Sequence, residues 1–158
     1  MPTASAAVSS SRMQFHALPI LGVDYSKLDP DLPRLLGYES KWQPDSPYWN
    51  DISYKQADLE EESRRALVDA SATLFQRLGC RDYARFDFRT DAAGVIKLLE
   101  VNPNPGWCWD GKFNLMAGFE GLSYPGLLRM IIEAAQSRLT EGVPEEWAAQ
   151  PVKQQARA

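Results

Sequence analysis

The stretch LLEVNPNPG, residues 98–106, decides the fold that we predict for this chain. An apolar run ends here in a carboxylate and two carboxamides, and a Pro-Gly turn closes the stretch. The segment RFDF, residues 85–88, lies a short distance upstream. Between the two lies TDAAG, residues 90–94, whose composition is typical of a turn. We therefore expect two antiparallel strands that form a β-hairpin.

Strand parity predicts which side chains of this hairpin share a face. Side chains two residues apart point the same way, so Arg85 lies beside Asp87, and Glu100 beside Asn102. A loop of two or four residues pairs Asp87 with Glu100, whereas a loop of three pairs Asp87 with Leu99. We expect the first register, because only that register gives the hairpin one dry face. The apolar residues predicted for that buried face are Phe86, Phe88, Leu99 and Val101.

The polar face allows two interpretations. Carboxylates of Asp87 and Glu100 at about 5 Å across neighbouring strands repel each other unless a positive charge lies between them. Oxygen ligands from Asp, Glu and Asn suit Mg²⁺, which shares its coordination with substrate phosphates. Arg85 adds a planar guanidinium suited to phosphate or to a developing oxyanion. Alternatively, this is the exposed polar face of an antiparallel sheet, on which Arg85 neutralises Asp87.

The two segments resemble the metal-binding end of the ATP-grasp ligases, and most closely that of the D-alanine–D-alanine ligase group. The pattern of that group is Arg-hydrophobic-Asp, a hairpin, and then Glu-x-Asn-x-x-Pro-Gly. The resemblance extends over residues 18–139. It implies an α+β fold, an antiparallel sheet with flanking helices that forms the C-terminal lobe of an incomplete ATP-grasp fold.

The resemblance also implies roles for individual residues. Asp87, Glu100 and Asn102 correspond to the ligands of two Mg²⁺ ions under the ATP phosphates, where Mn²⁺ can substitute, and Glu100 would bridge both ions. Arg85 matches the arginine that steadies the acyl-phosphate and tetrahedral intermediates. Gly106 matches a glycine whose backbone N–H helps to hold the oxyanion.

Aromatic segments flank this predicted site in the sequence. GYESKW, residues 37–42, resembles the family's Tyr-Glu-Ala-Lys-aromatic segment, which would place Lys41 on the ATP phosphates and Trp42 at the lip of the site. Alternatively, Lys41 is an exposed surface lysine. Trp107 and Trp109 follow the Pro-Gly turn, where dipeptide ligases have small and hydroxyl residues. The two tryptophans either pack or line a substrate pocket, and the difference argues against D-alanine as the second substrate.

Composition bounds the possible functions. The chain has 158 residues, 44% of them hydrophobic and 24% charged, as is ordinary for one globular domain. A net charge of −4 argues against a nucleic-acid binder, and no apolar run reaches the length of a membrane span. Cys80 and Cys108 show no metal-type spacing and are expected to be reduced thiols in a cytoplasmic protein. The lone histidine, His16, has no partner motif.

The remaining elements follow from periodicity and capping residues. A helix is expected over residues 58–78, with Asp58 as its N-cap and Gly79 at its C-terminal end. Leu67, Ala70, Leu74 and Leu78 form its predicted core stripe. A strand is expected at 18–23 and a loop at 24–36. Helices are expected at 113–119 and, capped by Ser123, at 124–139. We expect residues 1–13 to be a disordered segment, 14–139 the lobe, and 140–158 a flexible tail.

These expectations describe an ATP- and Mg²⁺-dependent carboxylate–amine ligase that acts through an acyl phosphate on small molecules. The ten glycines are scattered, so no glycine-rich phosphate loop is present in the sequence. The chain is therefore expected to be a truncated ligase, or one that needs the other ATP-grasp lobe from upstream sequence or from another chain. The alternative is a catalytically incomplete nucleotide- and metal-binding module, or an inactive fragment of such a ligase.

Overall fold

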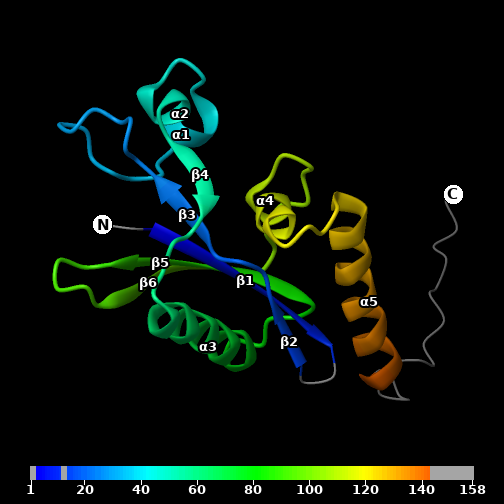
Figure 1. Ribbon diagram of the computed structural model, residues 1–158. Coiled ribbons are helices and arrows are strands. Elements are labelled where there is room, and N and C mark those ends of the chain that lie inside the picture. Colours follow the sequence, from blue (N-terminus) through cyan, green and yellow to red (C-terminus); the bar gives the residue numbers. More distant parts are fainter. Residues whose placement is uncertain (1–2, 12–13, 143–158) are drawn as a thin grey trace, which may run out of the picture.

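The computed structural model describes residues 3–11 and 14–142, which form one antiparallel sheet with helices on both of its faces. The strands are β1 (Thr3–Ser11), β2 (Gln14–Ala17), β3 (Leu21–Asp24), β4 (Ser53–Gln56), β5 (Tyr83–Thr90) and β6 (Ile96–Asn102). The helices are α1 (Glu39–Trp42), α2 (Pro47–Asn50), α3 (Glu61–Arg77), α4 (Lys112–Phe119) and α5 (Tyr124–Gly142). This arrangement confirms the predicted α+β class (Figure 1).

The strands follow the order β4-β3-β1-β5-β6, and β2 pairs with β1 off this path. Strand β1 is therefore central in the sheet. The prediction of a disordered segment at residues 1–13 is contradicted for residues 3–11, which form this strand. Its backbone pairs with β3 on one side and β5 on the other, so the ladder stabilises a segment whose Ala- and Ser-rich sequence carries no apolar pattern. Of the predicted tail, residues 140–142 belong to α5, and residues 143–158 lie outside the described part of the chain.

The hairpin of β5 and β6 has the predicted pairing, but reaches it by a different route. Thr90 pairs with Ile96 across a five-residue turn, a register that alone would place Asp87 opposite Leu99. A β-bulge between Asp87 and Phe88 shifts the register, and Asp87 then pairs with Glu100. Leu99 is consequently on the polar side and 59% exposed, so its predicted burial is wrong.

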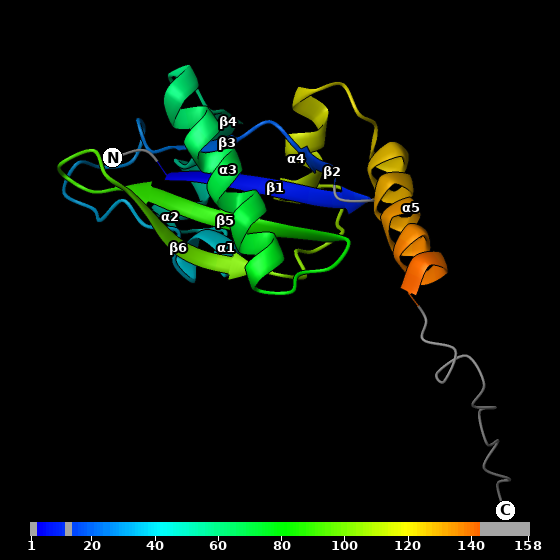
Figure 2. The same cartoon turned by 90° about the horizontal axis from the view of Figure 1, so that it is seen from below.

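Helix α3 covers one face of the sheet, as Figure 2 shows from that side. Its buried side chains are Leu67, Ser71 and Phe75, spaced by four residues, and they face the buried Phe86 and Phe88 of β5. The predicted boundaries need correction, because Glu60 rather than Asp58 is the N-cap, and Leu78 is 57% exposed. Gly79 ends the helix with a φ of 64°, which confirms the predicted C-terminal glycine.

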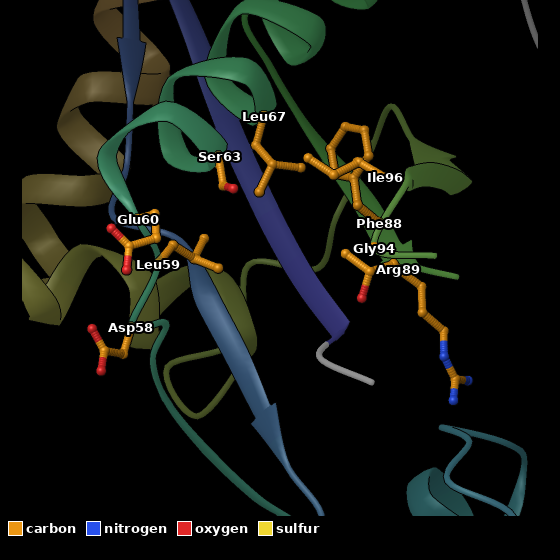
Figure 3. A pocket seen from close by; sticks show the side chains of 10 residues that line it. Asp58, Leu59, Glu60, Ser63, Leu67, Phe88, Arg89, Gly94 and Ile96 are labelled. Atoms are coloured by element: carbon orange, nitrogen blue, oxygen red, sulfur yellow. The ribbon is translucent and has the colours of Figure 1, made fainter. Parts of the chain in front are cut away.

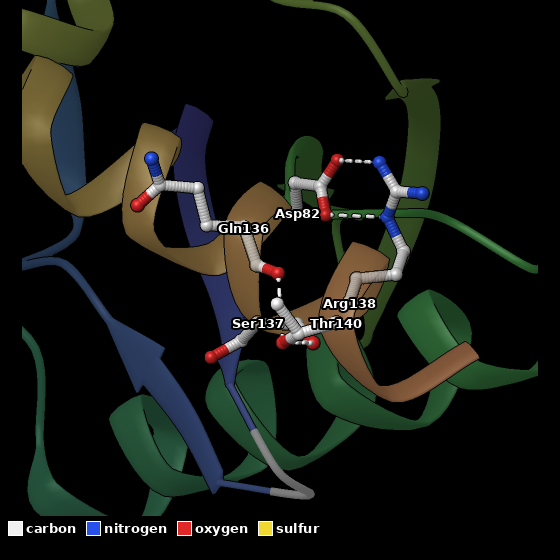
Figure 4. A network of polar contacts seen from close by, with 5 residues as sticks. All are labelled: Asp82, Gln136, Ser137, Arg138 and Thr140. Carbon is white, nitrogen blue, oxygen red and sulfur yellow. Dashed lines mark hydrogen bonds and ion pairs between the residues drawn. The ribbon is translucent and has the colours of Figure 1, made fainter. Parts of the chain in front are cut away.

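Helices α4 and α5 pack against the end of the sheet around Tyr83, Phe113 and Leu127. The Ser123 Oγ accepts a hydrogen bond from the Gly126 N–H, in agreement with the predicted cap of α5. Toward the other end of α5, Arg138 donates two hydrogen bonds of 2.8 Å to the Asp82 carboxylate, from Nε to Oδ1 and from Nη2 to Oδ2 (Figure 4). This bidentate pair ties α5 to the residue just before β5, where Asp82 has a φ of 65°.

Two further predictions concern cysteines and membrane spans. Cys80 and Cys108 are both free thiols. Within the described residues, no helix has the length and apolar character that crossing a bilayer requires.

Candidate active site

A pocket of about 280 Å³ lies on the face of the sheet opposite α3. Four residues named from the sequence line it together, namely Lys41, Arg85, Asp87 and Glu100. The other lining residues are Tyr25, Leu35, Leu36, Gly37, Arg89, Leu99 and Lys112. Three residues of the predicted polar face, Arg85, Asp87 and Glu100, thus form the floor of a pocket, whereas the fourth, Asn102, does not line it. Helices α1 and α4 contribute to its walls.

The centre of the floor is an ion pair between Arg85 and Asp87. The guanidinium donates from Nε to Oδ1 at 2.9 Å and from Nη2 to Oδ2 at 3.0 Å. Both side chains are largely buried, with 14% and 20% of their surfaces exposed. Because each carboxylate oxygen retains a second lone pair, Asp87 can accept this pair of bonds and still ligate a cation.

The donor set around Asp87 fits magnesium rather than a transition metal. Asp87 faces Glu100 across the ladder, and Arg85 faces Asn102 in the same register. In the described part of the chain, no cluster of three or more His, Cys, Asp or Glu side chains could enclose a metal by itself. Mg²⁺ is usually held by one or two carboxylates together with substrate phosphates, so the two carboxylates suffice. The Asn102 Oδ1 accepts a hydrogen bond from the Asn104 N–H and retains a second lone pair for a cation.

Lys41 reaches the pocket from α1, whose first turn is ordered by backbone bonds to Tyr38 and by the Ser40 hydroxyl, which donates to the Gly37 carbonyl. Arg89 is tied to the adjoining loop by a 2.9 Å hydrogen bond to the Arg34 carbonyl. Sequence analysis did not identify Arg89, because its role depends on a loop 55 residues away.

The loop that carries Gly106 is held in place by a buried proline and by two tyrosine hydroxyls. Pro105 is fully buried, and the Tyr83 hydroxyl donates to the Asn104 side chain. The Tyr124 hydroxyl donates to the carbonyl of Trp107, so strand β5 and helix α5 hold the loop on either side of Gly106. Among the described residues none accepts a hydrogen bond from the Gly106 N–H. That N–H is therefore available to an oxyanion, although Gly106 itself does not line the pocket.

Lys112 is a second site residue that sequence analysis missed. It is the first residue of α4, and its ammonium lies 5.0 Å from the centroid of the Tyr54 ring. The pKa of Lys112 is lowered to about 8, mainly by burial and then by the neighbouring Arg85 charge, against an opposing effect of Asp87. The one signal in the sequence was a cation at a predicted helix start, where the helix dipole disfavours it.

Comparison with known proteins identifies the family. The family model described as "D-ala D-ala ligase C-terminus" matches residues 24–133, which is most of the chain. The chain belongs to this family. The match confirms the predicted resemblance, and its residues include the whole pocket.

Relatives of this ligase C-terminal lobe are longer proteins. D-alanine–D-alanine ligase B of Chromobacterium violaceum is 31% identical over 96 residues, covering 61% of this chain and 30% of the relative. The uncharacterized protein y4sG of Sinorhizobium fredii is 37% identical over 82 residues, covering 52% of this chain and 24% of the relative. The match thus spans 24% to 30% of the length of these two relatives.

Solved structures share the fold of the lobe. The D-alanine–D-alanine ligase of Bacillus anthracis, crystallised in complex with ATP, matches with a TM-score of 0.63 at 22% identity. The match covers 89% of this chain and 40% of that protein. At this identity the likeness establishes the architecture of the lobe.

The two tryptophans of the ligase lobe lie near the site without lining its pocket. Trp107 packs edge-on against Tyr83, with ring centroids 5.6 Å apart. Trp109 is 73% exposed on the loop before α4. Trp107 packs on Tyr83 but is still 47% exposed, so substrate contact by either tryptophan stays a prediction.

A second pocket, of about 310 Å³, lies on the α3 face of the lobe (Figure 3). Its walls include Leu59, Leu67, Phe88 and Ile96, and Figure 3 shows Arg89 extending away from these apolar side chains. Asp58 and Glu60 contribute carboxylates at its rim beside the start of α3. None of the residues predicted for catalysis lines this pocket, so we assign the chemistry to the opposite face.

Proposed function

We propose that this chain is the catalytic C-terminal lobe of an ATP- and Mg²⁺-dependent carboxylate–amine ligase. The observation that carries the proposal is the convergence of Asp87 and Glu100 with Arg85 and Lys41 in one pocket. Membership of the ligase family supports it, as does a structural neighbour crystallised with ATP. The free thiols Cys80 and Cys108 support a cytoplasmic location.

In the proposed reaction, a carboxylate oxygen of the first substrate attacks the γ-phosphorus of ATP, and ADP leaves. The nitrogen of an amine then attacks the acyl carbon, phosphate leaves, and the nitrogen loses a proton. Asp87, Glu100 and Asn102 would hold two Mg²⁺ ions, which would offset the phosphate charge, and Mn²⁺ would serve similarly.

The chain's own residues have separate tasks in this proposal. Lys41 binds the phosphates as a mobile point charge. Arg85, held in place by Asp87, stabilises the charge of the acyl phosphate and of the tetrahedral intermediate. The Gly106 N–H donates to the oxyanion, and the anchored loop keeps that donor in position.

We further propose that full activity requires protein regions beyond this lobe, either upstream in a longer chain or on a second chain. The chain spans less than a third of the length of the ligase relative that it matches. It also contains no glycine-rich phosphate loop that could close over the nucleotide. This second observation favours the alternative function, a module that binds Mg²⁺-nucleotide without turning it over.

Calorimetric titration of the chain with ATP in the presence of Mg²⁺ tests the proposal. We expect saturable binding that requires Mg²⁺ and is lost in Glu100→Gln, while Lys97→Gln, outside the pocket on the same strand, binds as wild type. ADP release that depends on an added amine would establish ligase activity, and binding without release would establish the module. Failure of the wild-type chain to bind Mg²⁺-ATP would contradict both.

A further inference from the structure

Lys112 is a cation of the pocket for which the proposed reaction has no use. Four lining side chains are cationic and two are carboxylates. Lys41 and Arg85 have tasks in the reaction, and Arg89 donates to the Arg34 carbonyl. The fourth cation, Lys112, is the first residue of α4, and residues 103–111, here called the Trp-rich loop because they include Trp107 and Trp109, connect it to β6.

The surroundings of Lys112 hold its ammonium inside the pocket without an intramolecular ion pair. Among the described residues, no carboxylate lies within 4 Å of the ammonium, which instead lies 5.0 Å from the centroid of the Tyr54 ring. Arg85 and Lys41 repel the ammonium, while Asp87 and Glu100 attract it from a distance. Partial burial beside two other cations is unfavourable in the free protein, which is typical of a group that is poised for a ligand.

The ligand that this environment fits is an oxyanion that the nucleotide does not supply. Magnesium ions on Asp87 and Glu100 would offset the phosphates of ATP, and Lys41 already serves those phosphates. The charge left over is that of Lys112, next to Arg85, where the proposed acyl transfer takes place. An ammonium with three donors and an aromatic ring below it can grip a carboxylate or a phosphate without a fixed geometry.

We propose that Lys112 binds an oxyanion group of the substrate, a carboxylate or a phosphate, and so selects anionic substrates for this site. That the bound anion is part of a substrate rests on the proposed ligase function. Anion binding by Lys112 can be measured without any turnover. The Trp-rich loop, which differs from the dipeptide-ligase pattern, leads directly into Lys112 and would form the border of this subsite.

The test uses the whole chain with ¹³C-labelled lysine, titrated with inorganic phosphate or with succinate against chloride at equal ionic strength. Lys112→Met removes the charge at similar size, Lys112→Arg restores a charge, and Lys97→Met is a matched control outside the pocket. We expect a saturable shift of the Lys112 signal with at least one probe. Lys112→Met should weaken binding by about tenfold or more, Lys112→Arg should recover most of it, and Lys97→Met should match wild type.

Separate outcomes distinguish this proposal from the proposed ligase function. A preference for succinate assigns a carboxylate to the subsite, and a preference for phosphate assigns a phosphate. If Mg²⁺-ATP fails to bind but the probes bind through Lys112, the ligase function is contradicted and the subsite stands. Probe binding that is unchanged in Lys112→Met would overturn the subsite, as would no saturable binding of either probe. Equal weakening of Mg²⁺-ATP binding in Lys112→Met and Lys41→Met would assign Lys112 to the nucleotide and also overturn it.

Discussion

The two faces of strand β5 differ in what they contribute to the molecule. On one face Phe86 and Phe88 are buried under α3, in a cluster that also contains Leu67 and Phe75. On the other face Arg85 and Asp87 form the floor of a pocket with cations on its walls. One strand therefore separates a packed apolar core from a charged site by the thickness of a single backbone.

This difference indicates where stability and function lie. Apolar burial on the α3 face supplies free energy of folding in proportion to the area removed from water. The site face brings cations together at partly buried positions, which opposes folding unless a ligand is present. Substitutions on the two faces should consequently have opposite signs or very different sizes in stability measurements.

The largest effect is expected from Phe86→Ala. Phe86 is fully buried at the centre of the α3 face, so its truncation leaves a cavity. We expect the free energy of unfolding to fall by about 3–5 kcal/mol, measured by urea denaturation. Leu115→Ala, at an exposed position of α4, is the control and should change little. A loss below about 1 kcal/mol for Phe86→Ala would show that α3 does not form a close-packed face.

Lys112→Met should change the free energy of unfolding in the opposite direction and stabilise the ligand-free protein. The pKa of Lys112 is lowered to about 8 by burial, so the folded state binds this proton less tightly than the unfolded state. The penalty is fully present below pH 8 and disappears as the pH rises toward the ordinary lysine value of 10.5. After allowance for solvent screening we expect a gain of about 1–2 kcal/mol at pH 7. Thermal denaturation from pH 7 to pH 10 should show the gap between variant and wild type narrowing; a gap that widens contradicts the account.

Tyr83→Phe tests a residue that contributes both to the core, through its ring, and to the loop of Gly106, through its hydroxyl. The variant keeps the buried ring and removes the hydroxyl that donates to Asn104. We expect a loss of about 1 kcal/mol in the free energy of unfolding and a change in the NMR signal of the Gly106 amide, because the loop is released. Tyr124→Phe, which removes the bond to the Trp107 carbonyl, should shift the same amide. An unmoved Gly106 signal in both variants would mean that these hydroxyls do not position the loop.

The smallest effect is expected from Leu99→Thr. The bulge places Leu99 on the exposed polar side, so a polar, β-branched residue should change the free energy of unfolding by less than about 0.5 kcal/mol. A loss of about 2 kcal/mol or more in the free energy of unfolding would indicate that Leu99 is buried, as strand parity predicts, and would contradict the bulge.

The hairpin shows what could be predicted from the sequence and what could not. Asp87 opposite Glu100 followed from the need for one dry face and is confirmed. The parity argument assumed an uninterrupted ladder, whereas the five-residue turn and the bulge at Leu99 compensate each other. Turn length and bulges depend on local hydrogen bonds. Here the Asp91 carboxylate accepts hydrogen bonds from the Ala93 and Val95 N–H groups, and such bonds leave no trace in the hydrophobic periodicity of the sequence.

Long-range features were beyond sequence reasoning for a different reason. Strand β1 has no apolar alternation in its sequence and is ordered by backbone pairing with β3 and with β5, of which β5 lies far away in the chain. Lys112 is an ordinary lysine in the sequence and belongs to the site only because α4 returns to the sheet beside β3 and β4. The assignment of Asp87, Glu100 and Asn102 as metal ligands stays a prediction.

The most direct test of the central claim is NMR of the ¹⁵N-labelled chain with Mn²⁺ and ATP, because the paramagnetic ion broadens signals only near its binding site. The two-face account predicts loss of the amide signals of Asp87, Glu100 and Asn102, and their recovery in Glu100→Gln. The signals of α3, including its acidic first turn at Glu61 and Glu62, should stay sharp. Broadening centred on that turn, with the hairpin signals intact, would contradict the account.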